Sequence, residues 1–210
     1  LVGSEMCIRD SYLIPRWKEL GKINGKEYIV KTIVTTETIK TIAERNGVEM
    51  YDVYTGFKWI ANVMRENEGK KNYIGGGEES YGFLCEDFVR DKDAVSACVI
   101  LAEIAAWAKD QGLSLYQLLQ KIYVEYGFSK EKGISVVKKG KSGAEEIEAM
   151  MKKFRENPLT EIAGSKVTYF YDYSTLKGKD YAENETVTLD MPTTSNVLQY
   201  FTEDNTKVSI

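Results

Sequence analysis

Two carboxylates and a hydroxyl follow three consecutive glycines in the segment Gly75-Gly76-Gly77-Glu78-Glu79-Ser80-Tyr81-Gly82. Because glycine has no Cβ, such a turn lets backbone N–H groups and short side chains approach a ligand closely. A carboxylate accepts hydrogen bonds on both oxygens, so it can hold two neighbouring hydroxyls of a sugar ring, and a serine donates or accepts beside it. The segment therefore indicates sugar binding, although an ordinary glycine-rich surface turn can have the same composition.

The chain of 210 residues contains no histidine. This excludes imidazole general bases, Ser-His triads and metal sites that contain histidine. Any chemistry must therefore come from carboxylates, lysine, arginine, hydroxyls or a bound cofactor.

The net charge of −4 gives no general attraction to nucleic acid or to an anionic membrane. No run of residues approaches the roughly 18 apolar residues of a membrane span. Cys7, Cys85 and Cys98 form no CxxC pair, and their odd number argues against a disulfide framework. These features favour a cytoplasmic protein with neither nucleic acid nor membrane as a partner.

The first half of the chain alternates predicted strands and helices. A β-branched strand at 29–34 leads to a helix that Thr35 or Thr36 caps and that Gly47 ends in the αL conformation. A strand at 48–53, a helix that stops at Gly69 and a strand at 72–74 follow, and the last strand leads into the glycine segment. This order predicts a parallel α/β layer.

Three further helices are predicted beyond the glycine segment. The helix at 94–109 has Asp93 as its N-cap and is apolar nearly all round, so we expect it to be central. A capping box of Ser114 and Gln117 begins the next helix, which ends near 126–127. The lysine-rich residues 130–141 read as a solvated linker. Ser142 and Glu145 form a second capping box for a helix that ends at 157–158, and its buried stripe is expected to hold Ile147, Met150, Met151 and Phe154.

From about residue 164 onward, apolar and polar residues alternate, at 166–171, 186–190, 196–201 and 206–210. This predicts an antiparallel sheet with no helix to cover it, the start of a truncated second domain. Residues 1–11 show no clear periodicity and are predicted to be a non-native leader. The predicted domains are therefore 12–160 and 161–210. The expected fold class is a mixed, mainly parallel α/β domain followed by an incomplete α+β domain with an antiparallel sheet.

Three segments in this order, 55–58, 77–82 and 90–93, resemble the third domain of the α-D-phosphohexomutases, in the phosphoglucomutase branch. The resemblance runs from about residue 12 to residue 210, and 195–198 resembles the entry to the fourth domain of that family. The glycine segment is a strong signal here because the flanking segments are also present.

The resemblance implies a four-domain enzyme that interconverts glucose 1-phosphate and glucose 6-phosphate through a phosphoserine and a glucose 1,6-bisphosphate intermediate. By this resemblance, Glu78 and Ser80 bind sugar hydroxyls and Lys92 lies beside the substrate. The other residues assigned to substrate binding are Thr55, Gly56, Lys58, Gly77 and Glu79. A grip on the ring hydroxyls would serve both orientations of the intermediate, and the ammonium of Lys92 would favour a phosphate.

The sequence also departs from that family. The catalytic serine loop, the Asp-x-Asp-x-Asp magnesium loop and the Arg-x-Ser-Gly-Thr-Glu-Pro phosphate loop do not occur in it. We therefore expect an inactive fragment with no catalytic residue and no metal ligand of its own, and Mg²⁺ bound by an absent second domain.

Two alternatives stay open at this point. One is a phosphomannomutase or phosphopentomutase of the same family, since 57–59 also resembles a branch that accepts pentose phosphates. The other is a non-catalytic module that binds a sugar phosphate or has a structural role.

Overall fold

The computed structural model describes residues 4–79 and 82–210. It divides the chain into two compact units, Leu1–Gly133 and Ile134–Ile210. This boundary differs from the predicted one after residue 160, because helix α6 (Gly140–Glu156) belongs to the second unit. Met151 and Phe154 of α6 pack against the sheet of that unit, which explains why the helix joins it.

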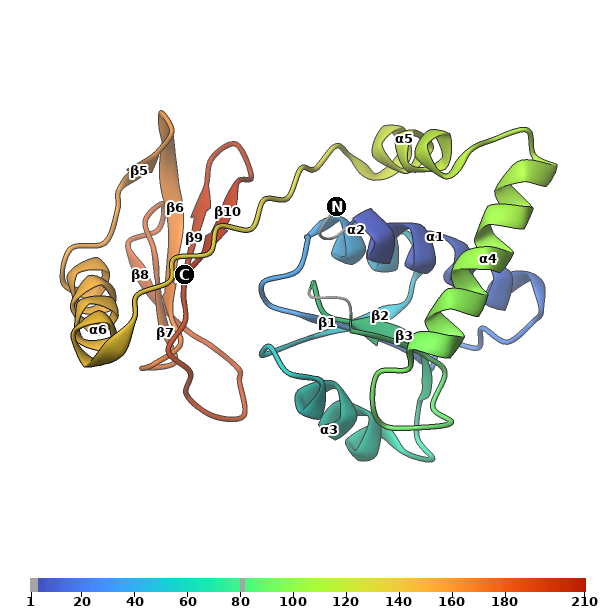
Figure 1. Cartoon of the computed structure of the whole chain (residues 1–210), viewed down its shortest axis with the longest axis horizontal. Helices are drawn as coiled ribbons and strands as arrows, with labels where there is room; N and C mark the ends of the chain where they lie inside the picture. The colour runs from blue at the N-terminus through green and yellow to red at the C-terminus, as the bar shows by residue number, and fades with distance from the viewer. Residues whose placement is uncertain (1–3, 80–81) are drawn as a thin grey trace. The chain divides into compact units, whose positions relative to one another are not determined.

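The first unit is built around a four-stranded sheet in the order β2-β1-β3-β4. Strands β1 (Glu27–Thr32), β2 (Glu49–Val53) and β3 (Asn72–Gly77) are parallel, and the short β4 (Phe83–Cys85) pairs antiparallel with β3. Figure 1 shows α1 (Ser4–Glu19) and α2 (Thr38–Asn46) on one face of this sheet and α3 (Phe57–Asn67) on the other. The mixed, mainly parallel α/β architecture is therefore confirmed.

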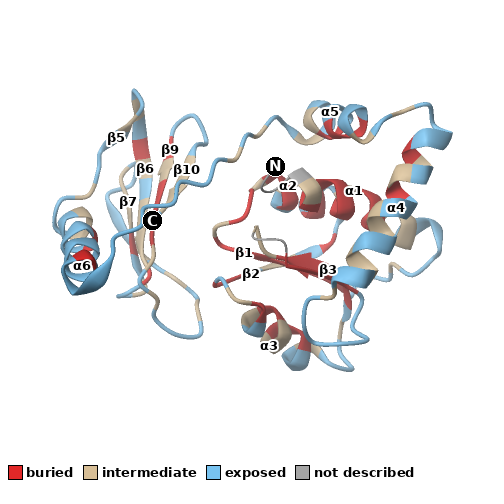
Figure 2. Ribbon diagram, in the orientation of Figure 1, coloured by how far each residue is buried: buried red, intermediate tan, exposed pale blue. Residues whose placement is uncertain are grey.

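Strand β1 is buried on both faces, as expected for the centre of a parallel sheet (Figure 2). Tyr28 and Val30 pack in the cluster that contains the apolar side of α3. Ile29 points to the opposite face and packs in the cluster that contains α1 and α2. Successive side chains of β1 therefore point to opposite faces of the sheet up to the end of the strand.

Helix α2 begins later than the sequence predicts. Its first residue is Thr38 and its N-cap position is Glu37, which makes no side-chain capping bond. Thr35 is therefore not the cap, whereas the Thr36 hydroxyl accepts a hydrogen bond from the backbone N–H of Thr38, the first helical residue, at 3.3 Å. The side chains of Thr35 and Thr36 also bond to Glu79 and to Ser129, respectively. The end of α2 is as predicted, because Gly47 has the left-handed conformation with φ of 68°.

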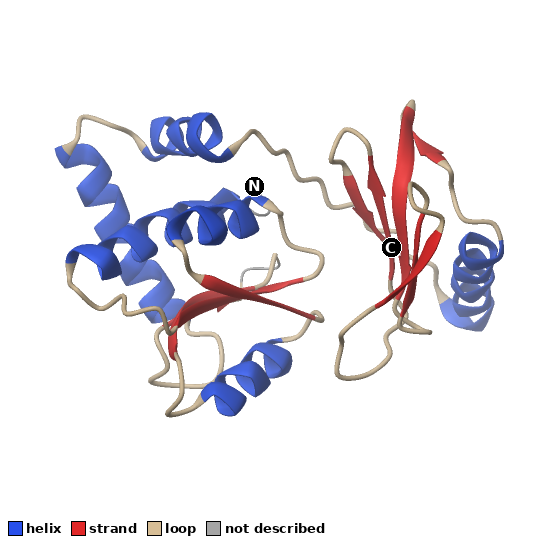
Figure 3. Ribbon diagram, turned by 180° about the vertical axis from the view of Figure 1, so that it is seen from behind, coloured by secondary structure: helices blue, strands red, loops and turns tan. Residues whose placement is uncertain are grey.

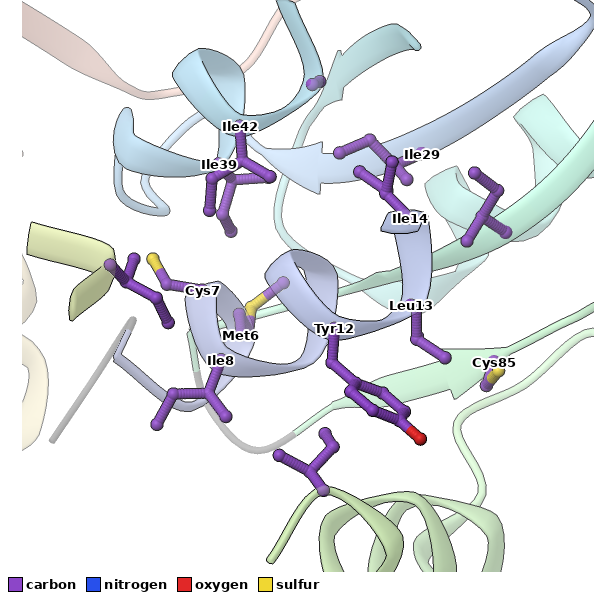
Figure 4. Packing of buried hydrophobic residues seen from close by; sticks show 14 of the residues in the cluster. Met6, Cys7, Ile8, Tyr12, Leu13, Ile14, Ile29, Ile39, Ile42 and Cys85 are labelled. Carbon is purple, nitrogen blue, oxygen red and sulfur yellow. The ribbon is translucent and has the colours of Figure 1, made fainter. Parts of the chain in front are cut away.

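The sequence assigns no structure to residues 1–11, but the structure places residues 4–11 in the first half of α1. Met6, Cys7 and Ile8 are buried in the main core of the unit, together with Ile39 and Ile42 of α2 (Figure 4). These residues therefore take part in the fold. Their non-native origin stays a prediction.

Helix α4 (Ala94–Asp110) has Asp93 as its N-cap, and the Asp93 carboxylate accepts bonds from the backbone N–H groups of Val95 and Ser96, as predicted. The expectation that this helix is central was wrong. Only Ile104 and Ala108 are buried, while Val95 and Val99 are 72% and 60% exposed. The helix packs on the rest of the unit through one narrow stripe. Its apolar composition was therefore a poor guide to how much of its surface is buried.

Helix α5 (Leu115–Tyr126) begins with the predicted capping box of Ser114 and Gln117. Its buried residues Leu118, Leu119 and Ile122 join the core that contains α1 and α2. None of the helices in the described part of the chain has the length and apolar character that crossing a membrane requires.

The strands of the second unit form one antiparallel sheet (Figure 3). Their order is β10-β9-β6-β7-β8, and the short β5 pairs with β6. The bounds are β5 (Glu161–Ile162), β6 (Ser165–Asp172), β7 (Lys177–Asp180), β8 (Glu185–Thr188), β9 (Leu198–Thr202) and β10 (Lys207–Ser209). The antiparallel sheet is as predicted, although β5 and β7 were not foreseen.

Helix α6 covers one face of this sheet, so the prediction of a sheet without a helix was wrong. Met151 packs with Val167, Leu198 and Tyr200. The helix begins at Gly140 after Lys139, which makes no side-chain cap bond, and the predicted capping box of Ser142 and Glu145 does not form the helix start. Ile147 and Met150 of the predicted buried stripe are exposed. A single layer of strands buries only a narrow side of the helix.

Candidate functional site

The loops that leave the three parallel strands lie at one edge of the first sheet. Strands β1, β2 and β3 end at Thr32, Val53 and Gly77, and their registers place Lys31 beside both Asp52 and Gly77. Carboxyl ends of parallel strands are where α/β sheets usually bind ligands. Four of the predicted site residues, Thr55, Gly56, Glu78 and Glu79, are in the loops at this edge.

The glycines that open the motif form a strand rather than a turn. Gly75, Gly76 and Gly77 are buried in β3, between β1 and β4. A Cβ on Gly76 would lie 2.4 Å from the carbonyl oxygen of Val30, and one on Gly77 would lie 2.3 Å from that of Gly82. The absence of side chains on these glycines thus allows the backbone of β3 to lie close to the neighbouring backbone. The sequence had instead suggested that it allows a ligand to come close.

Glu78 is the first residue after β3, and its carboxylate reaches the loop after β2. Oε1 accepts a hydrogen bond from the backbone N–H of Gly56. The N–H of Glu78 itself donates to the carbonyl oxygen of Gly82 at 2.7 Å, which closes the loop. Gly82 leaves room for the other carboxylate oxygen, because a Cβ there would lie 2.9 Å from Oε2. The Glu78 carboxylate is thus held in place with acceptor capacity to spare.

Glu79 is held by the last residue of β1 and by the loop that follows it. Its Oε2 accepts hydrogen bonds from the hydroxyls of Thr32 at 2.9 Å and Thr35 at 3.3 Å. The two hydroxyls are also within 2.8 Å of each other. Consecutive carboxylates of the motif are therefore anchored to two different loops. Ser80 and Tyr81 lie outside the described residues.

A basic pocket of about 620 Å³ begins at Gly56 and follows one side of α3. Lys58 and Lys92, both predicted site residues, line it together with Gly56. Their ammonium groups also lie near aromatic rings, that of Lys58 5.1 Å from the centre of Trp59 and that of Lys92 5.7 Å from the centre of Phe57. The structure brings Gly56, Lys58 and Lys92 to one place, with Glu78 bonded to its rim.

Lys92 pairs with its neighbour Asp91. The Lys92 ammonium lies 3.3 Å from Oδ1 of Asp91, and the backbone N–H of Lys92 donates to the same oxygen at 2.8 Å. The backbone N–H of Lys92, followed by its ammonium, holds the pKa of Asp91 below its usual value. Thr55 is exposed and precedes Gly56, while Gly77 is buried in β3 and is not among the residues that line the pocket.

Lys31 is a charged residue of this edge that the sequence analysis missed. Its side chain is 0% exposed and forms ion pairs with Glu37 at 3.1 Å and with Asp52 at 2.6 Å. A lysine within a β-branched strand followed by carboxylates is a weak signal, because nothing in the sequence shows that these groups meet. Arg65 and Arg90, which also line the basic pocket, were missed for the same reason.

Among the residues that the structure describes, no group of three or more carboxylate or thiol side chains is placed to hold a metal ion.

Comparison with known proteins gives a consistent set of relatives. Residues 10–126 match the family model described as phosphoglucomutase/phosphomannomutase, alpha/beta/alpha domain III. A phosphoglucomutase of Staphylococcus haemolyticus is 35% identical over 184 residues, which cover 88% of this chain and 33% of that protein. A phosphoglucomutase of Staphylococcus aureus is 40% identical over 169 residues, which cover 80% of this chain and 29% of that protein.

Among solved structures, a similar chain is the exocytosis-sensitive phosphoprotein pp63/parafusin, a phosphoglucomutase from Paramecium, in its open form. The TM-score is 0.59 at 15% identity, over 99% of this chain and 33% of that one. At this identity the likeness shows the fold. The chain spans about a third of the length of the curated relatives that it matches.

Proposed function

This chain belongs to the phosphoglucomutase/phosphomannomutase family through its α/β/α domain III, and from that premise we propose that it is the sugar-recognition part of a phosphohexomutase. The whole protein would interconvert glucose 1-phosphate and glucose 6-phosphate through a phosphoserine and a glucose 1,6-bisphosphate intermediate. The relatives described as phosphoglucomutases support this assignment. Membership of the family also confirms the resemblance that the motifs indicated.

The observation that carries the proposal is the bond between the Gly56 N–H and the Glu78 carboxylate. It fixes a hydroxyl-binding group at the rim of a pocket lined by Lys58 and Lys92. A carboxylate held in this way accepts from sugar hydroxyls without a further loss of side-chain freedom on binding. The nearby ammonium groups favour the phosphate of the same ligand.

Recognition of ring hydroxyls suits a reaction in which the sugar turns over between two half-reactions. The phosphorylated carbons exchange places, while the hydroxyls of the ring remain available to the same acceptors in either orientation. Glu78 and Ser80 would bind those hydroxyls, and Lys92 would stabilise the phosphate charge. Thr55, Gly56 and Lys58 would border the bound sugar, and Gly77 and Glu79 would hold the loop in shape.

The chemical step is assigned to parts of a longer protein. We propose that this chain alone has no mutase activity and that Mg²⁺ is bound elsewhere in the whole enzyme, where it would stabilise the transferring phosphoryl group. Glucose 1,6-bisphosphate would be the bound intermediate. A cytoplasmic location is proposed on the basis of the unpaired cysteine pattern.

The experiment is a titration of the ¹⁵N-labelled 210-residue chain with glucose 6-phosphate and glucose 1-phosphate, followed by NMR. The test variant is Glu78→Gln, which keeps the shape and an acceptor for Gly56 but loses the charge. We expect binding to weaken by about tenfold or more, because a hydrogen bond to a charged group is worth about 1.5–3 kcal/mol.

The matched control is Glu44→Gln, which removes one exposed carboxylate from α2. It should leave both affinities unchanged. Equal binding by Glu78→Gln and the original chain would mean that the loop is only a turn. Parallel titrations with mannose 1-phosphate and ribose 1-phosphate would identify the preferred sugar. A coupled assay tests the proposed lack of activity. Formation of glucose 6-phosphate by the chain alone would refute it.

A further inference from the structure

Helix α4 exposes an apolar stripe along one of its sides. Val95 and Val99 are 72% and 60% exposed, and Cys98, Ala102 and Ala106 are exposed as well. The other four residues follow Val95 by three to eleven positions, at spacings that place all five within about 100° around the helix axis. Figure 2 shows exposed surface along the length of α4.

The opposite side of α4 holds the helix on its own unit. Ile104 and Ala108 are buried there, and Ala97, Ile100 and Trp107 pack against the same core, which also contains α1 and α2. The helix therefore has two apolar sides, and the first unit covers one of them.

Contact with solvent alone does not explain the composition of the exposed side. No charged residue occurs at positions 94–102, and the carboxylate of Glu103 accepts a hydrogen bond from the Tyr12 hydroxyl at 2.7 Å. Helix α6 shows the contrast, since its exposed side carries charged residues such as Glu145 and Lys152. Surface helices usually have polar residues opposite the core, and contiguous exposed apolar residues mark an interaction surface. Helix α4 thus has the composition of a helix that is covered on both sides.

The side chains of the stripe suit packing against another helix. Two valines alternate with the smaller side chains of Cys98, Ala102 and Ala106. Small residues allow the axes of two helices to come to the short end of the usual range of about 8–10 Å. Large apolar side chains of the partner helix would fill the space over the alanines, because protein interiors are close-packed. The fitting occupant is therefore an amphipathic helix with leucine, isoleucine or methionine along its apolar side.

This occupant is expected in the same polypeptide rather than in a second copy of the chain. Helix α4 has 17 residues. It is therefore about 26 Å long, and one side of it offers on the order of 300 Å², well below the roughly 800 Å² per partner of a stable interface. A helix of the same polypeptide needs less area, because its effective concentration is high. The phosphoglucomutases that this chain matches are about three times as long as the chain, so they contain the additional domains that such a helix requires.

We propose that this stripe of α4 is an interdomain surface, which an apolar helix from another domain of a longer polypeptide covers. The stripe begins next to the candidate site, because Asp91 and Lys92 line the basic pocket and Asp93 caps α4 two residues before Val95. The covering domain therefore also comes close to the pocket. The inference rests on the greater length of the family relatives and not on sugar binding by Glu78, so the two proposals can fail separately.

The test compares the 210-residue chain with the whole protein, expressed from the complete reading frame of the source DNA. Both proteins are labelled with N-ethylmaleimide under native conditions, and the modified Cys98 peptide is quantified by mass spectrometry. In the 210-residue chain, we expect Cys98 to react as an exposed thiol does. In the whole protein, we expect the reaction to be at least about tenfold slower, because the covering helix must first move away.

A substitution in the middle of the stripe tests the contact itself. Val99→Glu should leave the urea midpoint of the 210-residue chain unchanged, because Val99 is exposed there. In the whole protein it should accelerate labelling of Cys98 by about tenfold, because a carboxylate is disfavoured in an apolar contact. Val124→Glu, at an 89% exposed position of α5, is the matched control and should leave Cys98 slow to react.

Each outcome bears on the proposal. Slow labelling of Cys98 in the whole protein, released by Val99→Glu and not by Val124→Glu, supports it. Equal labelling rates in the two proteins overturn it. Slow labelling in the 210-residue chain also overturns it, because the cover would then lie within that chain. A rate that falls as the concentration of the whole protein rises would identify a second copy as the occupant, which again contradicts the proposal.

Discussion

The carboxylate of Glu78 accepts a hydrogen bond from the backbone N–H of Gly56, which precedes it by 22 positions. The bond joins the loop after β3 to the loop after β2. The orientation of the proposed sugar-binding group is therefore set by the loop after β2 as well as by its own loop. A change of conformation at Gly56, where φ is 111°, should also disturb the position of Glu78.

Removal of both carboxylates around Lys31 should destabilise the first unit. Lys31 is fully buried, while Asp52 and Glu37 are 38% and 43% exposed. Glu37→Ala together with Asp52→Ala leaves the ammonium buried and unpaired, which we expect to cost about 3 kcal/mol in urea unfolding. Each single variant should cost less, because one partner remains.

The control for this experiment is Lys31→Met in the double-variant background. It removes the unpaired charge and keeps much of the side-chain volume, so it should restore a large part of the lost stability. A triple variant no more stable than the double variant would show that the buried charge is not the cause.

Replacement of Gly76 by alanine should be poorly tolerated. The new Cβ would lie 2.4 Å from the carbonyl oxygen of Val30 and 2.7 Å from the hydroxyl of Tyr73, and the former belongs to the backbone of the central strand. We expect a loss of about 1–3 kcal/mol or more in the free energy of unfolding. Gly133→Ala, where the added Cβ has no atom within 4 Å, is the matched control and should be close to neutral.

The three cysteines should react at different rates with a thiol-labelling reagent. Burial raises the pKa of the Cys85 thiol to about 12 and the pKa of the Cys7 thiol further still, while Cys98 is exposed. The thiolate is the reactive form, so at neutral pH we expect Cys98 to react first and the other two only on unfolding. Fast labelling of Cys7 in the folded chain would contradict the packing of α1 and favour the view that residues 1–11 are a leader outside the fold.

The turn between β9 and β10 should weaken in acid. The Thr202 hydroxyl, followed by the backbone N–H of Thr206, lowers the pKa of Asp204 from 3.8 to about 2. Because the folded pKa is the lower one, the ionised carboxylate stabilises the turn at higher pH, and this contribution is lost as the pH falls from about 4 to 2. Asp204→Ala should remove this part of the acid sensitivity, measured by NMR on the turn amides. Asp190→Ala, at an exposed position outside this turn, should retain it.

Local patterns in the sequence were enough to predict much of the secondary structure of the first unit. The strand-helix order gave the mainly parallel sheet, Gly47 ended α2 as expected, and Asp93 capped α4. These features depend on a few neighbouring residues, since a left-handed glycine or a capping carboxylate acts within one turn of chain. Burial of α4 could not be predicted in the same way, because its composition carries no information on how much of its surface the rest of the chain covers.

The sequence by itself therefore determined the chemical types at the candidate site, namely paired carboxylates after three glycines and lysines at positions 58 and 92. Only the tertiary structure decided how they are held: Glu78 by Gly56, Glu79 by Thr32, and Lys31 by one carboxylate of strand β2 and one from the start of α2. It also placed α6 with the second sheet. The physical reason is that these contacts join residues distant along the chain, and their existence depends on strand order, register and packing rather than on any local pattern.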